Sequence, residues 1–284
     1  MADLPLSPQA FYATPGVMTD PGPYAALFAG LPTALEDLVK VVQNTILHVF
    51  WAQRYGVELP ESRMGTLQLR SVQAKLALWT PGPLEAPRLP QERQVGNCRD
   101  FSLLLTAILR CQGVPARARC GFGTYFGPDH YEDHWIVEVW EAETGRWRQV
   151  DAQLDALQQH ALGIQFDPLD LPPGAFVLAG EAWRLARSGE VDPEKFGIFD
   201  FHGMEFIRGN VVRDLLSLNK VEILPWDWFI GYLDEESTQP EKIEATYSFF
   251  DRVAALTLAG DAAFEEIRTL YSSDPHSQIP AEWV

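Results

Sequence analysis

Cys98, His134 and Asp151 are the residues of this 284-residue chain whose types could together carry out covalent chemistry. A thiolate is a strong nucleophile, an imidazole can accept and return its proton, and a carboxylate can hold the imidazole in one tautomer. Their order along the chain is Cys, His, Asp. The combination predicts attack of the Cys98 sulfur on a carbonyl carbon, with His134 as general base and acid and Asp151 orienting the imidazole.

The segment that holds Cys98 is predicted to form a helix over residues 98–110. Gly96 lets the chain approach closely before this helix, and Gly113 and Pro115 end it. Apolar residues recur at helical spacing along it: Cys98, Phe101, Leu105 and Ile108. Because the N–H groups and the dipole at the start of a helix favour negative charge, the pKa of the Cys98 thiol is expected to be lowered.

An oxyanion formed by such an attack needs at least two hydrogen-bond donors. The backbone N–H of Cys98 is the first expected donor, because it lies at the start of the helix. The second is left open among three residues and the upstream loop: Gln94, Asn97 and Trp79. Four residues are expected to line the cleft: Asn97, Tyr125, Tyr131 and Trp135.

Each member of the trio has an ordinary structural explanation when it is taken alone. Cys98 could be a small buried residue on the apolar stripe of its helix. His134 could be a structural histidine within an apolar strand, and Asp151 a turn former or a helix cap. The hypothesis therefore depends on the three residues occurring together.

The spacing of two predicted strands places His134 and Asp151 on one face of a sheet. Strands are predicted over residues 133–140 and 146–152. A four-residue loop between them pairs Glu141 with Arg146, so that paired residues have index sums of 287. His134 and Asp151 sum to 285, which makes them diagonal neighbours on the same face. A loop one residue longer or shorter would move them to opposite faces.

Three separate motifs around these residues resemble the core of the transglutaminase-like superfamily. The first is a small-residue turn before a cysteine on a helix, the second an exit from that helix, and the third a pair of strand motifs. In this chain they read Gly96-Asn97-Cys98-Arg99-Asp100, then Gly113-Val114-Pro115-Ala116-Arg117, then His134-Trp135-Ile136-Val137 and Gly145-Arg146-Trp147 with Val150-Asp151. The chain is therefore identified as similar to bacterial transglutaminase-like domain proteins.

The resemblance implies an α+β fold of the papain type, with the nucleophile helix packed on an antiparallel sheet and further helices on both sides in sequence. It implies the roles given above for Cys98, His134 and Asp151, and attack on a carboxamide through a thioester. The chain lacks the paired Cys-x-x-Cys motifs of the glycanase branch and a calcium loop of the animal cross-linking type. Hydrolysis of a peptide or another carboxamide is therefore favoured, without a cofactor.

Two alternatives remain open for a chain of this pattern. One is a transferase that cross-links protein glutamine to an amine. The other, from a different functional class, is a catalytically silent module that binds a peptide in the same cleft. The reactivity of the thiol separates the second alternative from the enzyme.

Several other features are expected to be structural. Cys111 and Cys120 are interpreted as inert thiols, and no metal site is expected at His130 and His134 because their segment is a loop followed by a strand. Asp155 lies beyond the strand that ends at Asp151. Arg208-Gly209-Asn210 is interpreted as an ion pair or a helix cap, and Trp226-Asp227-Trp228 is interpreted as packing. An anion at the start of a helix is the alternative for the first of them.

The remaining elements are predicted from periodicity and from Pro and Gly positions. Residues 1–32 are expected to lie irregularly against the surface. A further strand is predicted over residues 117–125. Helices are predicted over six other ranges: 33–55, with Thr33 as its cap, 64–79, 176–187, 210–218, 241–258 and 262–271.

One domain is expected over residues 1–284, since no long polar linker interrupts it. Within it, the catalytic core is assigned to residues 93–156, a helical part to residues 1–92, and a mostly helical part to residues 157–284.

Charge and composition bound the partners. There are 22 Lys and Arg against 39 Asp and Glu, a net charge of −17, which disfavours nucleic acid and anionic membrane surfaces. Three cysteines are too few for a disulfide framework, and neither an export signal nor a membrane span is visible. A cytoplasmic location is expected, with a peptide or carboxamide substrate as the partner, and the oligomeric state is left open.

Overall fold

The computed structural model describes residues 6–79, 82–227, 240–274, 277 and 279–283. The chain divides into two compact units. Unit 1 comprises Met1–Ala118 and Ile136–Leu171, and unit 2 comprises Arg119–Trp135 and Pro172–Val284. The mixture of helices with a sheet confirms the expected α+β class. Among the described helices, none combines the length and the apolar character that a membrane span requires.

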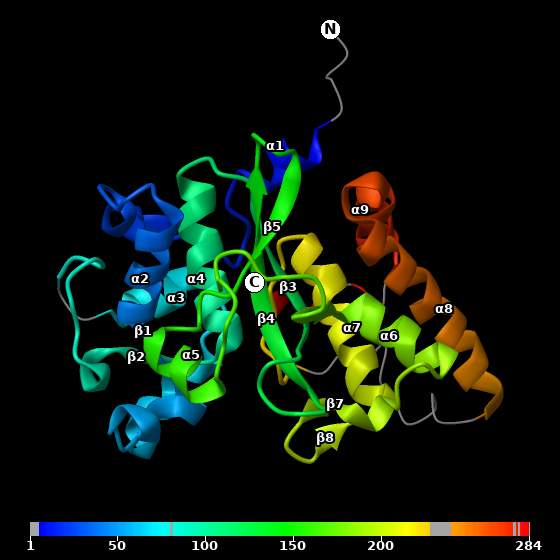
Figure 1. The fold of residues 1–284 in the computed structure, drawn as a ribbon. Helices are drawn as coiled ribbons and strands as arrows, with labels where there is room; N and C mark the ends of the chain where they lie inside the picture. Colours follow the sequence, from blue (N-terminus) through cyan, green and yellow to red (C-terminus); the bar gives the residue numbers. More distant parts are fainter. Residues whose placement is uncertain (1–5, 80–81, 228–239, 275–276, 278, 284) are drawn as a thin grey trace, which may run out of the picture. The chain divides into compact units, whose positions relative to one another are not determined.

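Unit 1 is built around the helix α4, Cys98–Cys111. Its other helices are α1 (Pro8–Tyr12), α2 (Leu35–Thr45), α3 (Val72–Ala77) and α5 (Ala156–Leu162). Helices α2 and α3 pack against α4, as Figure 1 shows. Almost the whole of α4 is buried, which agrees with its apolar sequence. The helix ends where predicted, since Gly113 takes the left-handed conformation with φ of 76°.

Two short parallel strands of unit 1 lead directly to α4. Strand β1 (Ile46–His48) pairs in parallel with β2 (Gln94–Gly96). The chain passes from β2 through Asn97 into α4, so the pairing of β2 determines where the helix begins.

The predicted hairpin is confirmed in its register. Strand β4 (Tyr131–Glu141) pairs antiparallel with β5 (Arg146–Val150) from Val137↔Val150 to Glu141↔Arg146. The index sum is therefore 287, as the four-residue loop required.

Unit 2 contains the other end of the same sheet. Strand β3 (Ala116–Gly123) and β4 pass from one unit into the other, and in unit 2 the strand order is β6-β3-β4-β7-β8. The additional strands are short: β6 (Phe176–Leu178), β7 (Phe196–Ile198) and β8 (Phe201–His202). Strand β7 pairs in parallel with the start of β4. The sequence predicted β3, β4 and β5 and did not indicate these three strands.

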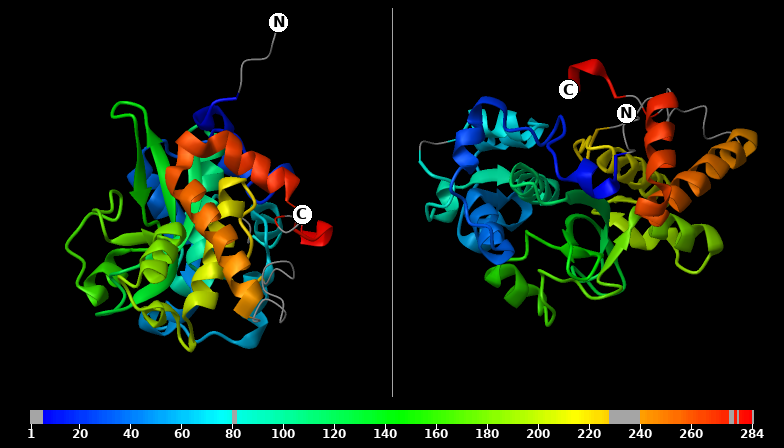
Figure 2. Two further views of the ribbon diagram at one scale, coloured as in Figure 1. Left: turned by 90° about the vertical axis from the view of Figure 1, so that its right-hand side faces the viewer. Right: turned by 90° about the horizontal axis from the view of Figure 1, so that it is seen from above.

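Four helices complete unit 2: α6 (Ala179–Ser188), α7 (Met204–Leu218), α8 (Pro240–Ala259) and α9 (Phe264–Ser273). They pack on one another, and Figure 2 shows α8 and α9, in orange and red, against the yellow α7. The helices predicted over 241–258 and 262–271 are close to these bounds. The other two predictions are displaced, because residues 176–178 pair with β3 as a strand and α7 begins six residues before 210.

The long helix predicted over residues 33–55 is wrong beyond Thr45. Helix α2 begins after Ala34 rather than after Thr33, and the chain becomes extended at Ile46. Residues Ile46–His48 pair with β2, and Val49–Tyr55 form 3₁₀ turns. Pairing with a distant segment outweighs the helical periodicity of this stretch.

The helix predicted over residues 64–79 is also shorter than expected. Residues Glu61–Gln68 form 3₁₀ turns, and α3 starts only at Val72, where the Ser71 hydroxyl accepts a hydrogen bond from the Ala74 N–H at 3.2 Å. Residues 6–32 are largely irregular, as expected of this segment, with short helical pieces. Tyr12 and Met18 are nonetheless 1% exposed, so this segment contributes to the core.

Candidate active site

Cys98 is the first residue of α4 and is 8% exposed. Asn97 caps the helix: its Oδ1 accepts a hydrogen bond from the Asp100 N–H at 3.3 Å. The Asp100 carboxylate in turn accepts one from the Asn97 N–H at 3.2 Å. This reciprocal capping box holds the turn around Cys98 from both sides. The thiol therefore lies where the helix dipole stabilises a thiolate, as predicted.

Gly96 is required for this turn. A Cβ added to it would lie 2.8 Å from the Ile46 Cγ2 and 2.9 and 3.1 Å from the Asp100 Oδ2 and Cβ. Distances of that size are shorter than real Cβ atoms tolerate, and neither Ile46 nor the Asp100 Cβ can easily move. The expectation that Gly96 permits a close approach is confirmed.

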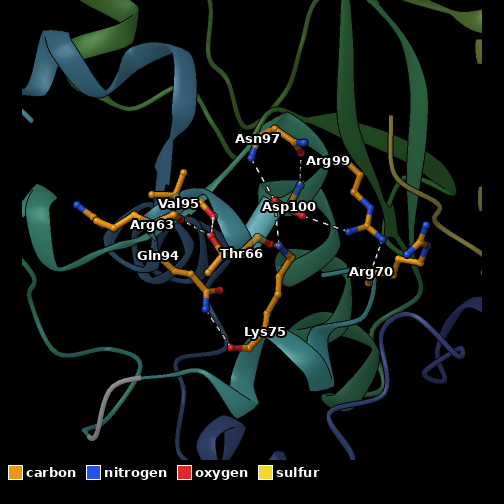
Figure 3. A network of polar contacts seen from close by, with 9 residues as sticks. All are labelled: Arg63, Thr66, Arg70, Lys75, Gln94, Val95, Asn97, Arg99 and Asp100. Atoms are coloured by element: carbon orange, nitrogen blue, oxygen red, sulfur yellow. Dashed lines mark hydrogen bonds and ion pairs between the residues drawn. The ribbon is translucent and has the colours of Figure 1, made fainter. Parts of the chain in front are cut away.

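A buried charge cluster surrounds the capping carboxylate (Figure 3). The Lys75 Nζ lies 3.1 Å from the Asp100 Oδ2, and the Arg99 Nη1 lies 3.1 Å from the Asp100 Oδ1. Lys75 also donates to the Thr66 carbonyl at 3.0 Å, and Arg99 donates to the Arg70 carbonyl. Asp100 and Arg99 are 1% and 0% exposed. The cluster links α3 to the first turn of α4.

The cluster carries two cations and one carboxylate, so it adds positive charge directly after Cys98 in the sequence. Burial lowers the pKa of Lys75, although the Asp100 carboxylate acts in the opposite direction and Arg99 reinforces the lowering. A positive environment at the start of a helix favours a thiolate over a thiol. Arg99 and Asp100 lie within the motif around Cys98, but the sequence predicted no role for either residue. The available signal was the Asn-x-x-Asp spacing of residues 97–100, which is that of a capping box.

The candidate side-chain donors to the oxyanion differ in whether they already donate a hydrogen bond within the protein. The Trp79 Nε1–H donates to the Gly82 carbonyl at 3.3 Å, and the Gln94 Nε2 donates to the Lys75 carbonyl at 3.1 Å. The Asn97 Nδ2 is buried and has no hydrogen-bond partner within the described chain. An unsatisfied buried amide is costly, so this group is available to a ligand.

His134 lies in β4, within unit 2, and is 1% exposed. Three aromatic rings contact its imidazole edge-on: Phe126 at a centroid distance of 4.8 Å, Tyr125 at 6.0 Å and Phe176 at 6.3 Å. These ring contacts restrict the orientation of the imidazole. Of the residues expected to line a cleft, Tyr125 therefore contacts His134 directly.

The carboxylates next to His134 are affected by burial. The pKa of Asp133 is raised mainly by burial, against the guanidinium of Arg213 and a hydrogen bond from the Asn210 Nδ2 at 2.7 Å. Burial also raises the pKa of Glu132. Both carboxyl groups therefore ionise less readily than in water, which reduces the negative charge beside His134.

Asp151 follows β5 directly, lies in unit 1 and is fully buried. Its N–H donates to the Pro168 carbonyl at 2.8 Å, and its Oδ1 accepts from the Gln153 N–H at 2.9 Å. Neighbouring Asp155 has a different task, because it caps α5 and accepts a hydrogen bond from the Tyr55 hydroxyl at 2.7 Å.

The proposed trio is thus divided between the units, with Cys98 and Asp151 in unit 1 and His134 in unit 2. Each residue is buried on a defined element, and the assembly of the three into one site stays a prediction.

The remaining expected cleft residues have structural contacts. Asn97 is the cap of α4 and is 5% exposed. Tyr131 stacks on Phe196 at 4.4 Å, and Trp135 is buried at 1% exposure. Their part in a cleft stays a prediction.

The features set aside as structural behave so, with one correction. Arg208-Gly209-Asn210 lies inside α7 rather than before a helix, so these residues cannot form an anion site at a helix start. Arg208 instead forms an ion pair with Glu205. Asp227 accepts from the Leu224 N–H at 2.9 Å, while Trp228 lies outside the described residues.

The other two cysteines differ from Cys98 in position. Cys120 is fully buried in β3, and burial raises the pKa of the partly exposed Cys111. No group of three or more His, Cys, Asp or Glu side chains among the described residues is placed to hold a metal ion.

Comparison with known protein families gives a match over part of the chain. A family model described as the transglutaminase-like superfamily matches residues 72–152, a range that contains Cys98, His134 and Asp151. No curated protein matches the sequence. The solved structure of a candidate cysteine protease from Cytophaga hutchinsonii is 15% identical, with a TM-score of 0.33, and the match covers 50% of this chain and 40% of that one. The chain thus spans less than half of that protein, and a likeness at this TM-score carries no weight here.

Proposed function

We propose, from the match of residues 72–152 to the model of the transglutaminase-like superfamily, that the protein is a cysteine-dependent enzyme acting on the carboxamide of a peptide or related substrate. Hydrolysis is the favoured outcome. The single observation that carries the proposal is the placement of Cys98 at the first position of α4, inside a capping box and beside a buried cluster with excess positive charge.

In the proposed reaction the Cys98 thiolate adds to the amide carbonyl carbon, and His134 gives a proton to the leaving amine. The acyl group remains on the sulfur as a thioester, which water activated by His134 hydrolyses. Asp151 is proposed to orient the imidazole and to stabilise its protonated form.

We assign the oxyanion donors to two groups of the same turn. The backbone N–H of Cys98 is one, and the Asn97 Nδ2 is the other, because the latter is buried and without a partner in the described chain. The Asn97 Oδ1 is engaged by the Asp100 N–H, which fixes the orientation of the amide.

The test of the proposal is the pKa of the Cys98 thiol. The alkylation rate of each cysteine by iodoacetamide would be followed from pH 5 to 10, with the labelled peptides quantified by mass. Cys98 is expected to react with a midpoint well below the free-thiol value of about 8.5. Cys111 serves as the internal control, because burial raises its pKa.

The same titration separates the enzyme from a silent binding module. Replacing His134 with Ala should raise the midpoint of Cys98, because an imidazolium no longer stabilises the thiolate. A Cys98 midpoint at or above about 8.5 in the unaltered protein would reject the enzyme in favour of the module.

Hydrolysis and amine transfer are distinguished by their products. A glutamine-containing peptide would be incubated with and without a primary amine, and ammonia and the conjugate would be measured. Ammonia release without the amine supports hydrolysis. A strict requirement for the amine would favour the cross-linking transferase.

A further inference from the structure

A groove of about 710 Å³ lies beside β2 in unit 1 and is not part of the site described above. Gln94 and Val95 of β2 form one part of its lining, and Trp79 forms another. Three arginines also line it: Arg63, Arg88 and Arg93. The groove is therefore cationic, in a protein whose net charge is −17.

Backbone carbonyls hold the three guanidinium groups, and the charges of Glu92 and Glu85 also act on Arg88. Arg88 donates to the carbonyls of Pro83, Leu84 and Ala86 at 2.9–3.2 Å, and its guanidinium lies 4.3 Å from the centroid of the Trp79 ring. Carbonyl bonds satisfy donors but leave the positive charge in place, and ordering the side chain in advance reduces the entropy lost on binding.

The other two arginines are held in the same way. Arg63 donates to the Arg93 carbonyl at 2.6 Å, and Arg93 donates to the Arg88 carbonyl at 3.4 Å. In the described part of the chain none of the three forms an ion pair with a carboxylate. The acidic lining residue, Glu92, accepts a hydrogen bond from the Leu89 N–H at 2.8 Å, so its carboxylate is engaged by the backbone.

The groove adjoins the nucleophile along one strand. Val95 lies three residues before Cys98, so their Cα atoms are at most about 11 Å apart. Figure 3 shows the Arg63 side chain extending away from the Lys75–Asp100 cluster. Thr66 and Gln94 line the groove and also form hydrogen bonds with Lys75, so the groove borders the cluster. A peptide in extended conformation advances about 3.3 Å per residue. A residue about three positions from the attacked carboxamide would therefore reach the groove.

We propose that the groove lined by Arg63, Arg88 and Arg93 is a subsite for an acidic side chain of the peptide substrate, about three residues from the carboxamide that Cys98 attacks. The proposal rests on the proposed function for the identity of that carboxamide. Guanidinium groups pair with carboxylates in a bidentate manner, which gives both affinity and selection of charge.

The test compares two blocked heptapeptides in which glycines separate a central glutamine from the two end residues. One peptide has aspartate at both ends, so that an acid lies three residues away in either direction, and the other has asparagine. Binding to the Cys98→Ala protein is measured by calorimetry in about 0.15 M salt, where charges more than about 8 Å apart are largely screened. The aspartate peptide is expected to bind about tenfold more tightly.

Variants then test whether the groove causes the preference for the aspartate peptide. Arg63→Gln should reduce the preference for the aspartate peptide about fivefold. Arg54→Gln is the matched control, because Arg54 is exposed, lies in the same unit and does not line the groove, and it should leave the preference within about twofold. Arg63→Glu should reverse the preference toward a lysine-containing heptapeptide, a gain that misfolding cannot produce.

Equal affinity for the aspartate and asparagine peptides would overturn the proposal, and so would an equal loss in Arg63→Gln and Arg54→Gln. Turnover of the same peptides by the unaltered protein is measured separately. An aspartate preference that depends on Arg63, without any turnover, supports the subsite and counts against the proposed function alone. Turnover of the peptides without a preference for aspartate supports the proposed function and counts against the subsite alone.

Discussion

At the scale of single residues, the two polar atoms of the Asn97 side chain differ in their contacts. Its Oδ1 caps α4, while its Nδ2 is buried with no partner within the described chain. A cap alone explains the oxygen but leaves the cost of the buried nitrogen unexplained. Stabilisation of an oxyanion would use that nitrogen only during the reaction, which is the requirement for lowering a transition state.

Substitution of Asn97 separates capping by the oxygen from the proposed oxyanion contact of the nitrogen. Asn97→Ser keeps a side-chain oxygen that can cap the helix but removes the amide N–H groups. We expect kcat to fall by about 10²–10³, and the free energy of unfolding to change by less than about 0.5 kcal/mol. Peptidase kinetics and urea unfolding provide the two measurements. Loss of stability in proportion to loss of activity would indicate a structural role only.

Gly96 gives a second prediction at this scale. Gly96→Ala should lower the free energy of unfolding by about 1–3 kcal/mol, because its Cβ would overlap with Ile46 and Asp100. Gly65→Ala is the matched control, since a Cβ there meets nothing within 4 Å, and its change should stay within about 0.5 kcal/mol. Urea midpoints measure both, and equal effects would contradict the close approach at Gly96.

At the scale of elements, the start of α4 is fixed by three other segments. Strand β2 delivers the chain to Asn97, β1 pairs with β2, and α3 supplies Lys75 to the capping carboxylate. The buried ion pair is not evidence of net stability, because desolvation of two charges offsets their attraction. The ion pair instead restricts the position of the Asp100 carboxylate, so that it can cap Asn97 in only one orientation.

The lowered pKa of Lys75 predicts a pH dependence of stability. Since its folded-state pKa lies below the unfolded value of about 10.4, the unfolded chain binds more protons between these two values. Stability attributable to Lys75 therefore rises as the pH increases through that window. The unfolding free energy of the unaltered protein, relative to Lys75→Met, should increase from pH 8 toward pH 10.5.

Lys40→Met provides the control for this titration. Lys40 is exposed, and hydrogen bonds to Glu36 and Asp37 raise its pKa, so its contribution has the opposite sign. Urea titrations at each pH measure both variants. A Lys75→Met difference that does not change with pH would show that burial does not shift this lysine.

At the scale of the whole molecule, two strands are common to both compact units. The divisions fall at 118/119 and 135/136, which are inside β3 and β4 rather than at the 92/93 and 156/157 boundaries suggested by composition. The expectation of a single domain over residues 1–284 stays a prediction.

Cooperative unfolding tests this expectation. The urea transitions followed by tryptophan fluorescence and by far-ultraviolet circular dichroism should coincide. Tryptophan fluorescence reports on both units, since Trp147 lies in unit 1 and Trp183 in unit 2. A fluorescence transition in two steps, or a midpoint different from that of circular dichroism, would show that the units unfold independently.

The sequence by itself determined the local structure around the proposed nucleophile and the hairpin. The helix over residues 98–110 follows from its apolar spacing and from the glycines around it, and the β4–β5 register follows from the loop length. Both depend on interactions between residues close in the chain, which composition and spacing express directly.

Only the tertiary structure decided where pairing with a distant segment outweighs the local preference for a helix. Residues 46–48 and 176–178 carry apolar patterns compatible with a helix, yet they are strands because β2 and β3 offer them hydrogen-bonding partners. The fold also brings together charged residues that are distant in the sequence. Lys75 lies 25 residues from Asp100, and the groove arginines come from segments 25–30 residues apart. Such pairings depend on how the chain returns on itself, which no window of the sequence contains.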